Sequence, residues 1–174
     1  MIRREWFRLA ASAVAGPAFA APGMRLATFE ADVTPPLGSP LFTGPARSTA
    51  DPLQARGFVL LGAGQPVVVA AIDWCEIRNR SYEHWRRTLA RAAKTAPERV
   101  LVSCVHQHDA PYTDAGAQRL LDPQRMQEKL CDPEFETRAA ASVAQSLRGS
   151  LGGARRVTHI GNGQAKVEHV ASKT

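Results

Sequence analysis

The chain has 174 residues and a formal net charge of +6 at pH 7; 44% of its residues are hydrophobic and 22% are charged. This is the composition of a globular protein of about one domain, and it argues against disorder. No apolar run reaches the ~18 residues of a membrane span, so we expect no transmembrane segment. The basic residues are scattered or share a helix with acidic ones, and no Gly-rich phosphate loop is present, so we expect no nucleic-acid partner.

Residues 1–22, MIRREWFRLAASAVAGPAFAAP, are typical of an export signal. Arg3-Arg4 precedes a weakly apolar, Ala-rich stretch, and Ala18-Phe19-Ala20 forms an A-x-A cleavage site. The paired arginines favour a Tat-type signal peptide over residues 1–20, with an ordinary Sec signal as the second interpretation. We therefore expect an exported protein, periplasmic or secreted. An amphipathic N-terminal helix is the alternative, although Gly16-Pro17 would break it.

The next part of the chain predicts three strands. Residues 25–33 alternate like a half-buried strand, and residues 34–55 form a Pro/Gly/Ser-rich loop. Two apolar, β-branched runs follow, 57–61 and 67–72, and the Gly-containing segment 62–65 between them indicates a β-hairpin. The second run, VVVAAI, is apolar on both faces and predicts a central strand.

A helix and a fourth strand are expected after this hairpin. Asn79 or Ser81 is a suitable N-cap for a helix that runs to about Ala93, with an apolar stripe of Trp85, Leu89 and Ala92. Residues 99–105, RVLVSCV, predict the next buried strand. Strand, helix and strand in this order form a crossover unit, which is normally right-handed and joins parallel strands.

The remainder of the chain predicts one long helix and a second hairpin. Residues 106–131 form a polar loop with room for one short helix, and a loop this long is usually functional. Asp132 as N-cap and Pro133 at the first position start a helix whose buried stripe is Phe135, Ala139, Val143 and Leu147. Residues 155–160 and 165–170 predict the hairpin. Together the elements predict an α/β fold with a mixed β-sheet and crossover helices.

Three cysteines, Cys75, Cys104 and Cys131, are an odd number without C-x-x-C spacing. One disulfide is compatible with an oxidising compartment, and the sequence does not say which pair forms it. Free, buried cysteines that behave as small hydrophobic residues are the simpler interpretation.

The segment that best predicts chemistry follows the strand 99–105. In an extended backbone, residues i and i+2 project to the same side, so His106 and His108 can point into one cavity at the carboxyl end of this strand. Two imidazoles so placed are half of a zinc site. Asp109 can fix a ring tautomer by a hydrogen bond. Two loop histidines without a metal are the alternative.

Other residues offer weaker candidates. Asp73 ends the strand 67–72 and comes near the two histidines if that strand neighbours 99–105, so its carboxylate either serves the site or caps the next turn. Cys104 as a nucleophile with His106 as its base is a rival hypothesis, but a cysteine inside an apolar strand is more often buried and inert. We expect His84, on the basic helix, to be solvated.

Several motifs, in order, resemble the N-terminal part of the neutral/alkaline non-lysosomal ceramidases. They are Asp32-Val33-Thr34-Pro35 with Gly38, Asp51-Pro52-Leu53-Gln54-Ala55-Arg56-Gly57-Phe58, the strand ending in Asp73, and His106-x-His108-x-x-Pro111. The resemblance covers roughly residues 26–170. In the family's motif T-H-T-H-S-G-P, this chain has Val105, Gln107, Asp109 and Ala110 in place of Thr, Thr, Ser and Gly.

The resemblance implies that residues 21–174 are the N-terminal portion of a ceramidase-like catalytic domain. It also implies a zinc-dependent amidase that cleaves an N-acyl amide, with a lipid-like small molecule as substrate. By this resemblance His106 would be a zinc ligand and His108 would lie beside the metal and the substrate. We therefore expect His108 to be catalytic, together with Asp73 from its position at the end of the strand 67–72. The family's further ligands, a His, a Glu and a Tyr, would fall beyond Thr174. A non-catalytic exported binding module and an inactive fragment of a longer enzyme are the alternatives.

Overall fold

The computed structural model describes residues 18–19, 23–124 and 129–166. The expected signal peptide, residues 1–20, lies outside the described residues apart from Ala18 and Phe19. The second strand expected near the end of the chain also lies largely outside them. Among the described residues, none of the helices is both long enough and apolar enough to cross a membrane.

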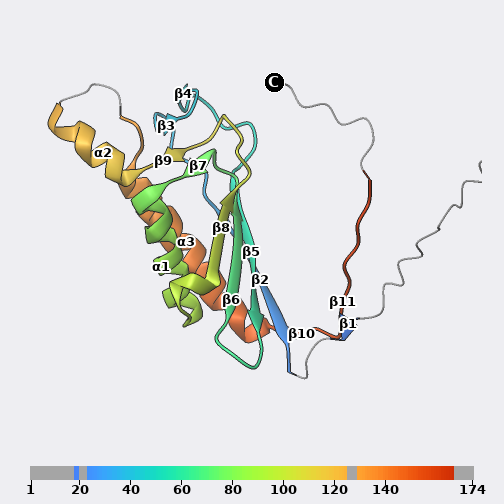
Figure 1. The fold of residues 1–174 in the computed structure, drawn as a ribbon. Helices are drawn as coiled ribbons and strands as arrows, with labels where there is room; N and C mark the ends of the chain where they lie inside the picture. The colour runs from blue at the N-terminus through green and yellow to red at the C-terminus, as the bar shows by residue number, and fades with distance from the viewer. Residues whose placement is uncertain (1–17, 20–22, 125–128, 167–174) are drawn as a thin grey trace, which may run out of the picture. The chain divides into compact units, whose positions relative to one another are not determined.

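A five-stranded mixed sheet forms the centre of the fold, in the order β10-β2-β5-β6-β8 (Figure 1). Neighbouring strands are antiparallel except for β6 and β8, which are parallel. This confirms the predicted α/β fold with a mixed sheet. The strands are β2 (Arg25–Asp32), β5 (Gln54–Leu61), β6 (Val67–Ile72), β8 (Val100–Cys104) and β10 (Arg155–Arg156).

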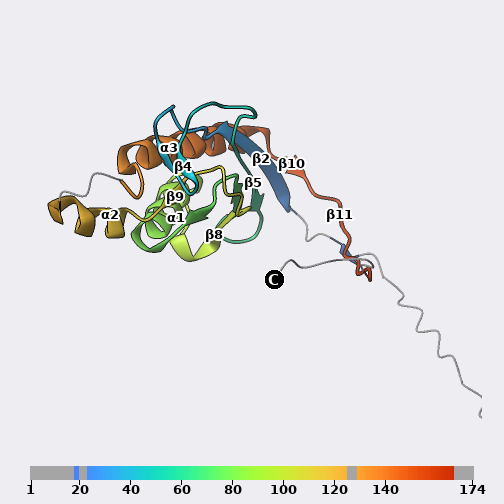
Figure 2. The same ribbon diagram turned by 90° about the horizontal axis from the view of Figure 1, so that it is seen from above.

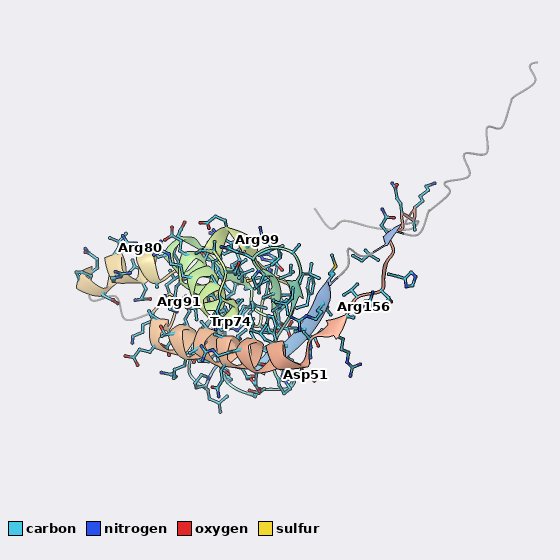
Figure 3. The ribbon with its side chains drawn as sticks, turned by 90° about the horizontal axis from the view of Figure 1, so that it is seen from below. Asp51, Trp74, Arg80, Arg91, Arg99 and Arg156 are labelled. Carbon is cyan, nitrogen blue, oxygen red and sulfur yellow. The ribbon has the colours of Figure 1, made fainter. Side chains whose placement is uncertain are left out.

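Two helices, α1 (Asn79–Ala93) and α3 (Pro133–Ser150), pack on one face of this sheet (Figure 1, Figure 2). The alternating strand residues that face them form the core, and Val59, Val68 and Ile72 have no exposed surface. Trp74 is also fully buried and lies in the interior beside α3 (Figure 3), where its ring meets Trp85 of α1 edge-on at 5.4 Å. These contacts hold the end of β6, and the residues that follow it, against the helices.

The starts of the two helices differ in how far the sequence predicts them. Asp132 caps α3 as expected, since its Oδ1 accepts hydrogen bonds from the N–H groups of Glu134 and Phe135 at 3.0 Å. The expected caps of α1 are wrong: its N-cap is Arg78, without a side-chain cap bond. Ser81 instead donates its hydroxyl to Glu136 of α3, and Asn79 donates to Asp114. A tertiary partner has replaced the local one in both cases.

The sheet edges also differ from expectation. β8 is an edge strand among the described residues, so the prediction of a buried strand holds for one face only; Leu101, on the other face, is 54% exposed. β5 begins at Gln54, three residues earlier than predicted, because the end of the Pro/Gly-rich loop pairs with β2. A run of apolar residues does not reveal how many neighbours a strand has.

Shorter elements complete the described chain. The strands are β3 (Pro40–Leu41), β4 (Gly44–Pro45), β7 (Glu76–Ile77) and β9 (Tyr112–Thr113), and the helices are α2 (Ala115–Leu121), η1 (Pro97–Arg99), η2 (Asp122–Gln124) and η3 (Leu151–Gly153). β3 pairs with β4, and β7 with β9. The short helix α2 confirms the one expected within residues 106–131.

The described residues do not contain the predicted final hairpin. β10 pairs with the edge of β2, whereas β11 (His159–Ile160) pairs with β1 (Ala18–Phe19) in a separate unit. Residues 161–166 contain no strand, and 167–170 lie outside the described residues. Residues 155–160, expected to form one strand, therefore form two short strands that pair with β2 and with β1.

Candidate metal centre

The parallel strands β6 and β8 bring their carboxyl ends to the same edge of the sheet. Hydrogen bonds continue past the strand ends, from the N–H of Val105 to the carbonyl of Ile72 at 3.1 Å and from the N–H of His106 to the carbonyl of Trp74 at 3.2 Å. The segment after β6 is thus held beside the segment after β8. This edge is where ligands bind in many α/β folds.

Cys75, His106 and His108 come together at this edge. One ligand atom from each lies within 4.8 Å of the others, and no other such group of histidine, cysteine or carboxylate residues occurs in the described part of the chain. The His106 Nδ1 atom is 3.9 Å from the Cys75 Sγ atom, and the two imidazole centroids are 5.3 Å apart. Cys75 is fully buried, whereas the His106 side chain is 57% exposed. The group therefore has a buried floor and an open side.

The two imidazoles meet for a different reason from the one expected. His106 has a φ of 64°, in the left-handed region, so the backbone is not extended there and the argument from strand pleating is wrong. The chain turns sharply at His106, and the turn still leaves the rings edge to face at an interplanar angle of 82°. The juxtaposition depends on this turn rather than on sequence spacing.

The orientation of His106 is set by its neighbours after β6. Its Nδ1 atom lies 3.2 Å from the Cys75 carbonyl oxygen and 3.5 Å from the Glu76 Oε1 atom. The tautomer that donates the Nδ1 proton to this carbonyl leaves Nε2 with a free lone pair, which is the usual arrangement of a metal-bound histidine. Glu76 in turn forms an ion pair with Arg78.

His108 is held by the hairpin of β3 and β4. The Phe42 ring packs against the His108 imidazole with centroids 4.7 Å apart and an interplanar angle of 46°, and the Phe42 N–H donates to the Ala110 carbonyl at 3.1 Å. The Thr43 hydroxyl donates to the Asp109 carboxylate at 2.9 Å. Asp109 thus binds a hydroxyl, where the sequence analysis expected it to bind an imidazole.

Asp73 does not join this group. Its Oδ2 atom accepts a hydrogen bond from the Gln54 N–H at 2.9 Å and lies 3.8 Å from an Arg56 nitrogen, so the carboxylate faces β5. Its carbonyl accepts the Gln107 side-chain amide at 2.9 Å. The structure therefore connects Asp73 to the histidine segment through its backbone.

The remaining candidates have other environments. All three thiols are free. Burial raises the pKa of the Cys104 thiol to about 12, which disfavours the hypothesis that it is a nucleophile at neutral pH. His84 is half-buried rather than solvated, and burial together with the charge of Arg91 lowers its pKa.

Cys75 is the site residue that sequence reasoning missed. It lies three positions after the end of β6, beyond the range in which strand alternation fixes a side. The signal that could have found it is topological, since parallel strands place the residues after both carboxyl ends side by side.

One thiol and two imidazoles suit zinc better than a hard cation such as magnesium. In a tetrahedral zinc site, nitrogen and sulfur ligand atoms lie about 3.5 Å from one another. Here one ligand atom from each of the three residues lies within 4.8 Å of the others, so the group would have to contract around an ion. Burial and the Glu76 carboxylate raise the pKa of the Cys75 thiol, and the metal would have to displace this proton.

Comparison with known proteins identifies no family for the chain. No family model matches the sequence, and no curated protein matches it. Solved structures similar to this chain include a ceramidase complexed with C2 (18% identity, TM-score 0.49) and the neutral ceramidase from Pseudomonas aeruginosa (14% identity, TM-score 0.43). Each comparison covers 75% of this chain, which spans about a fifth (21%) of the length of each match. The function of this chain therefore has to be argued from its own residues.

Proposed function

We propose that the chain supplies part of a zinc-dependent amide hydrolase site, with Cys75, His106 and His108 as protein ligands. The observation that supports it is the convergence of one thiol and two imidazoles within 4.8 Å at the carboxyl edge of the parallel strands. Three protein ligands and one open position are the pattern of a catalytic zinc site. The sequence resemblance to the neutral ceramidases suggests an N-acyl amide of a lipid-like molecule as the substrate.

The chemistry of this proposal divides between the ion and the protein. Zinc, when bound, polarises the amide carbonyl and lowers the pKa of its water to about 7. Cys75 would hold the ion from the buried side, and the exposed imidazoles would leave room for a substrate. Glu76 lies 3.5 Å from His106 Nδ1 and stabilises the positive charge that ligation places on this ring.

Asp73 takes a positioning role in the proposal. Its carboxylate joins the first residue of β5 through the Gln54 N–H, and its carbonyl receives the Gln107 amide, so it fixes the backbone on both sides of the site. The expectation that Asp73 is catalytic stays a prediction.

Export also stays a prediction. N-terminal sequencing of periplasmic material should find a mature chain that begins at Ala21.

A cobalt titration tests the metal site directly. Co²⁺ should bind to the purified chain with a thiolate-to-metal charge-transfer band, because Cys75 supplies sulfur. Cys75→Ala should abolish the band, and Cys131→Ala should keep it, since Cys131 is an equally buried thiol outside the group. A band that survives Cys75→Ala would remove the thiol from the proposal.

Activity is tested separately, with zinc-loaded protein and an N-acyl amide of a long-chain amine. Hydrolysis that depends on zinc and is lost in His106→Ala would support the hydrolase. Tight zinc binding without hydrolysis would instead favour the alternative of a non-catalytic binding module.

A further inference from the structure

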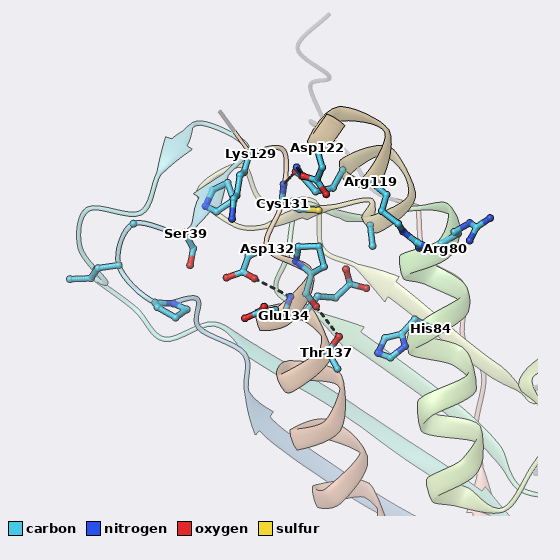
Figure 4. A pocket seen from close by; sticks show the side chains of 18 residues that line it. Ser39, Arg80, His84, Arg119, Asp122, Lys129, Cys131, Asp132, Glu134 and Thr137 are labelled. Carbon is cyan, nitrogen blue, oxygen red and sulfur yellow. Dashed lines mark hydrogen bonds between the residues drawn. The ribbon is translucent and has the colours of Figure 1, made fainter. Parts of the chain in front are cut away.

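Outside the metal centre, two surfaces of the described part of the chain are open to a partner. One is a pocket of about 820 Å³ at the first turns of α1 and α3, where cations and carboxylates line the same walls (Figure 4). Side chains of both charges favour no single class of ligand there. The other surface is the free edge of the sheet at β8, whose side chains are uncharged.

The two edges of the sheet differ in length and in charge. β10 has two residues, Arg155 and Arg156, and both are exposed. β8 has five residues, VLVSC, without a charge or a proline, and Leu101 and the adjoining Val105 are 54% and 55% exposed. Proteins usually protect a free edge with a short strand, charged side chains or proline. β10 has this protection and β8 lacks it, so β8 is the edge at which a further strand can pair.

The exposed leucine of β8 is the outer end of an apolar row. Phe58, Val69 and Leu101 lie side by side across β5, β6 and β8, on the face of the sheet that α1 and α3 leave open. A strand added beside β8 would extend this row and cover Leu101.

The backbone of β8 presents hydrogen-bonding groups on its free side. The N–H of Val105 donates to the Ile72 carbonyl of β6, and the backbone groups of successive residues point to opposite sides of a strand. The groups that point away from β6 are therefore those of Val100, Val102 and Cys104. The Arg86 side chain donates to the Val100 carbonyl at 3.2 Å, which agrees with this orientation. Among the described residues, no strand pairs with this side of β8.

We propose that β8 pairs, antiparallel, with β8 of a second copy of this chain, around a two-fold axis at Val102. In an antiparallel pair, two residues that exchange both hydrogen bonds lie opposite each other. This register places Val102 opposite the partner's Val102 and Val100 opposite the partner's Cys104, so each outward-pointing residue of β8 meets another. Leu101 faces the partner's Ser103 and lies diagonally beside the partner's Val105, so two exposed apolar side chains cover each other.

The charges at the two edges favour a closed pair of copies. β8 is uncharged, so two copies meet there without like-charge repulsion, whereas the arginines of β10 oppose the addition of a copy at the other edge. The contact is short, and we expect it to bury less than the about 1,600 Å² that is typical of stable complexes. The pair should therefore be weak and form at high protein concentration. It requires neither zinc nor an amide substrate.

Sedimentation equilibrium of the chain between about 10 µM and about 1 mM tests the pairing. A chelator and a thiol reductant are present, so that neither a shared metal nor a disulfide joins two copies. Leu101→Lys places a charge on the edge and should weaken dimerisation by about tenfold or more. The matched control is Leu120→Lys, the same substitution at a 76% exposed position on α2, which should change it by less than about twofold. Circular dichroism establishes that both variants are folded.

Hydrogen exchange of the native chain locates the contact. The N–H groups of Val102 and Cys104 should exchange rapidly in dilute solution and become protected at high concentration, because only a second copy provides their acceptors. A chain that stays monomeric at all concentrations would overturn the proposal, as would a dimer that Leu101→Lys leaves intact. Protection of these two groups that is independent of concentration would overturn it as well, since a segment of the same chain would then cover the edge.

Discussion

At the scale of single residues, His108 depends on an aromatic neighbour from a distant part of the sequence. Phe42 is 53% exposed, so its contribution to the hydrophobic core is small. Its ring nevertheless packs against the His108 ring, with centroids 4.7 Å apart, and lies 6.3 Å from the Tyr112 ring. The Arg78 guanidinium lies 5.0 Å from the centroid of the Tyr112 ring. These contacts indicate that Phe42 restricts the orientation of His108.

Phe42→Ala should weaken zinc or cobalt binding by about tenfold, in the range seen when groups that orient metal ligands are removed. Thermal stability should change little, because the side chain is half exposed. Leu37→Ala is the control, since Leu37 is also an exposed apolar residue of this part of the chain, at 66% against 53% for Phe42. Equal metal affinity in Phe42→Ala and the native chain, measured by competition with a chelator, would show that His108 does not need this support.

At the scale of elements, the sheet leaves no space at Gly57. This residue lies in β5, opposite Phe29 of β2 and Ala70 of β6. A Cβ atom there would lie 2.3 Å from the Phe29 ring and 2.4 Å from the Val69 carbonyl oxygen. Because Gly57 has no Cβ atom, the Phe29 ring can lie across β5 and fill the core under α3. The packing of the sheet and of the helix on it therefore both require glycine at this position.

Gly57→Ala should therefore destabilise the fold by about 2–3 kcal/mol, the cost of overpacking a rigid core. Phe29 can move, but the backbone carbonyl of the neighbouring strand cannot do so without a shift of the sheet. Gly64→Ala, in the turn between β5 and β6, meets no atom within 4 Å and should change stability by less than about 0.5 kcal/mol. Urea unfolding of both variants measures the difference, and equal midpoints would contradict the packing argument.

At the scale of the whole molecule, the sequence predicts those features that local chemistry determines. The strand β6, the helix start at Asp132-Pro133 and the pairing of β6 with β8 through a crossover helix all follow from short-range patterns. Short-range patterns do not predict that Cys75 belongs to the metal group or that β8 is an edge strand, because both depend on which segments meet across the sheet. The predicted cap of α1 was wrong for the same reason, since the Ser81 hydroxyl donates its hydrogen bond to Glu136 of α3.

The contact between α1 and α3 should make the free energy of unfolding depend on pH. Glu136 is 2% exposed, and its buried position raises the pKa of its carboxyl group, although the Ser81 hydroxyl opposes this and Asp114 adds to it. A carboxyl whose pKa is higher in the folded than in the unfolded state binds more protons when folded. Its stabilising effect is complete below the unfolded pKa and is lost as the pH rises through the folded pKa.

Glu136→Gln should remove the loss of stability at rising pH, because the amide oxygen still accepts the Ser81 hydroxyl and the amide carries no charge that must be buried. We expect the variant to be more stable than the native chain by about 1 kcal/mol at pH 7, and the difference to vanish below the unfolded pKa of about 4.5. Glu134→Gln, an exposed neighbour on the same helix, should follow the native profile. Urea unfolding between pH 4 and 8 measures all three proteins. A variant less stable than the native chain at pH 7 would mean that the charged Glu136, held by Ser81, strengthens the contact between the helices.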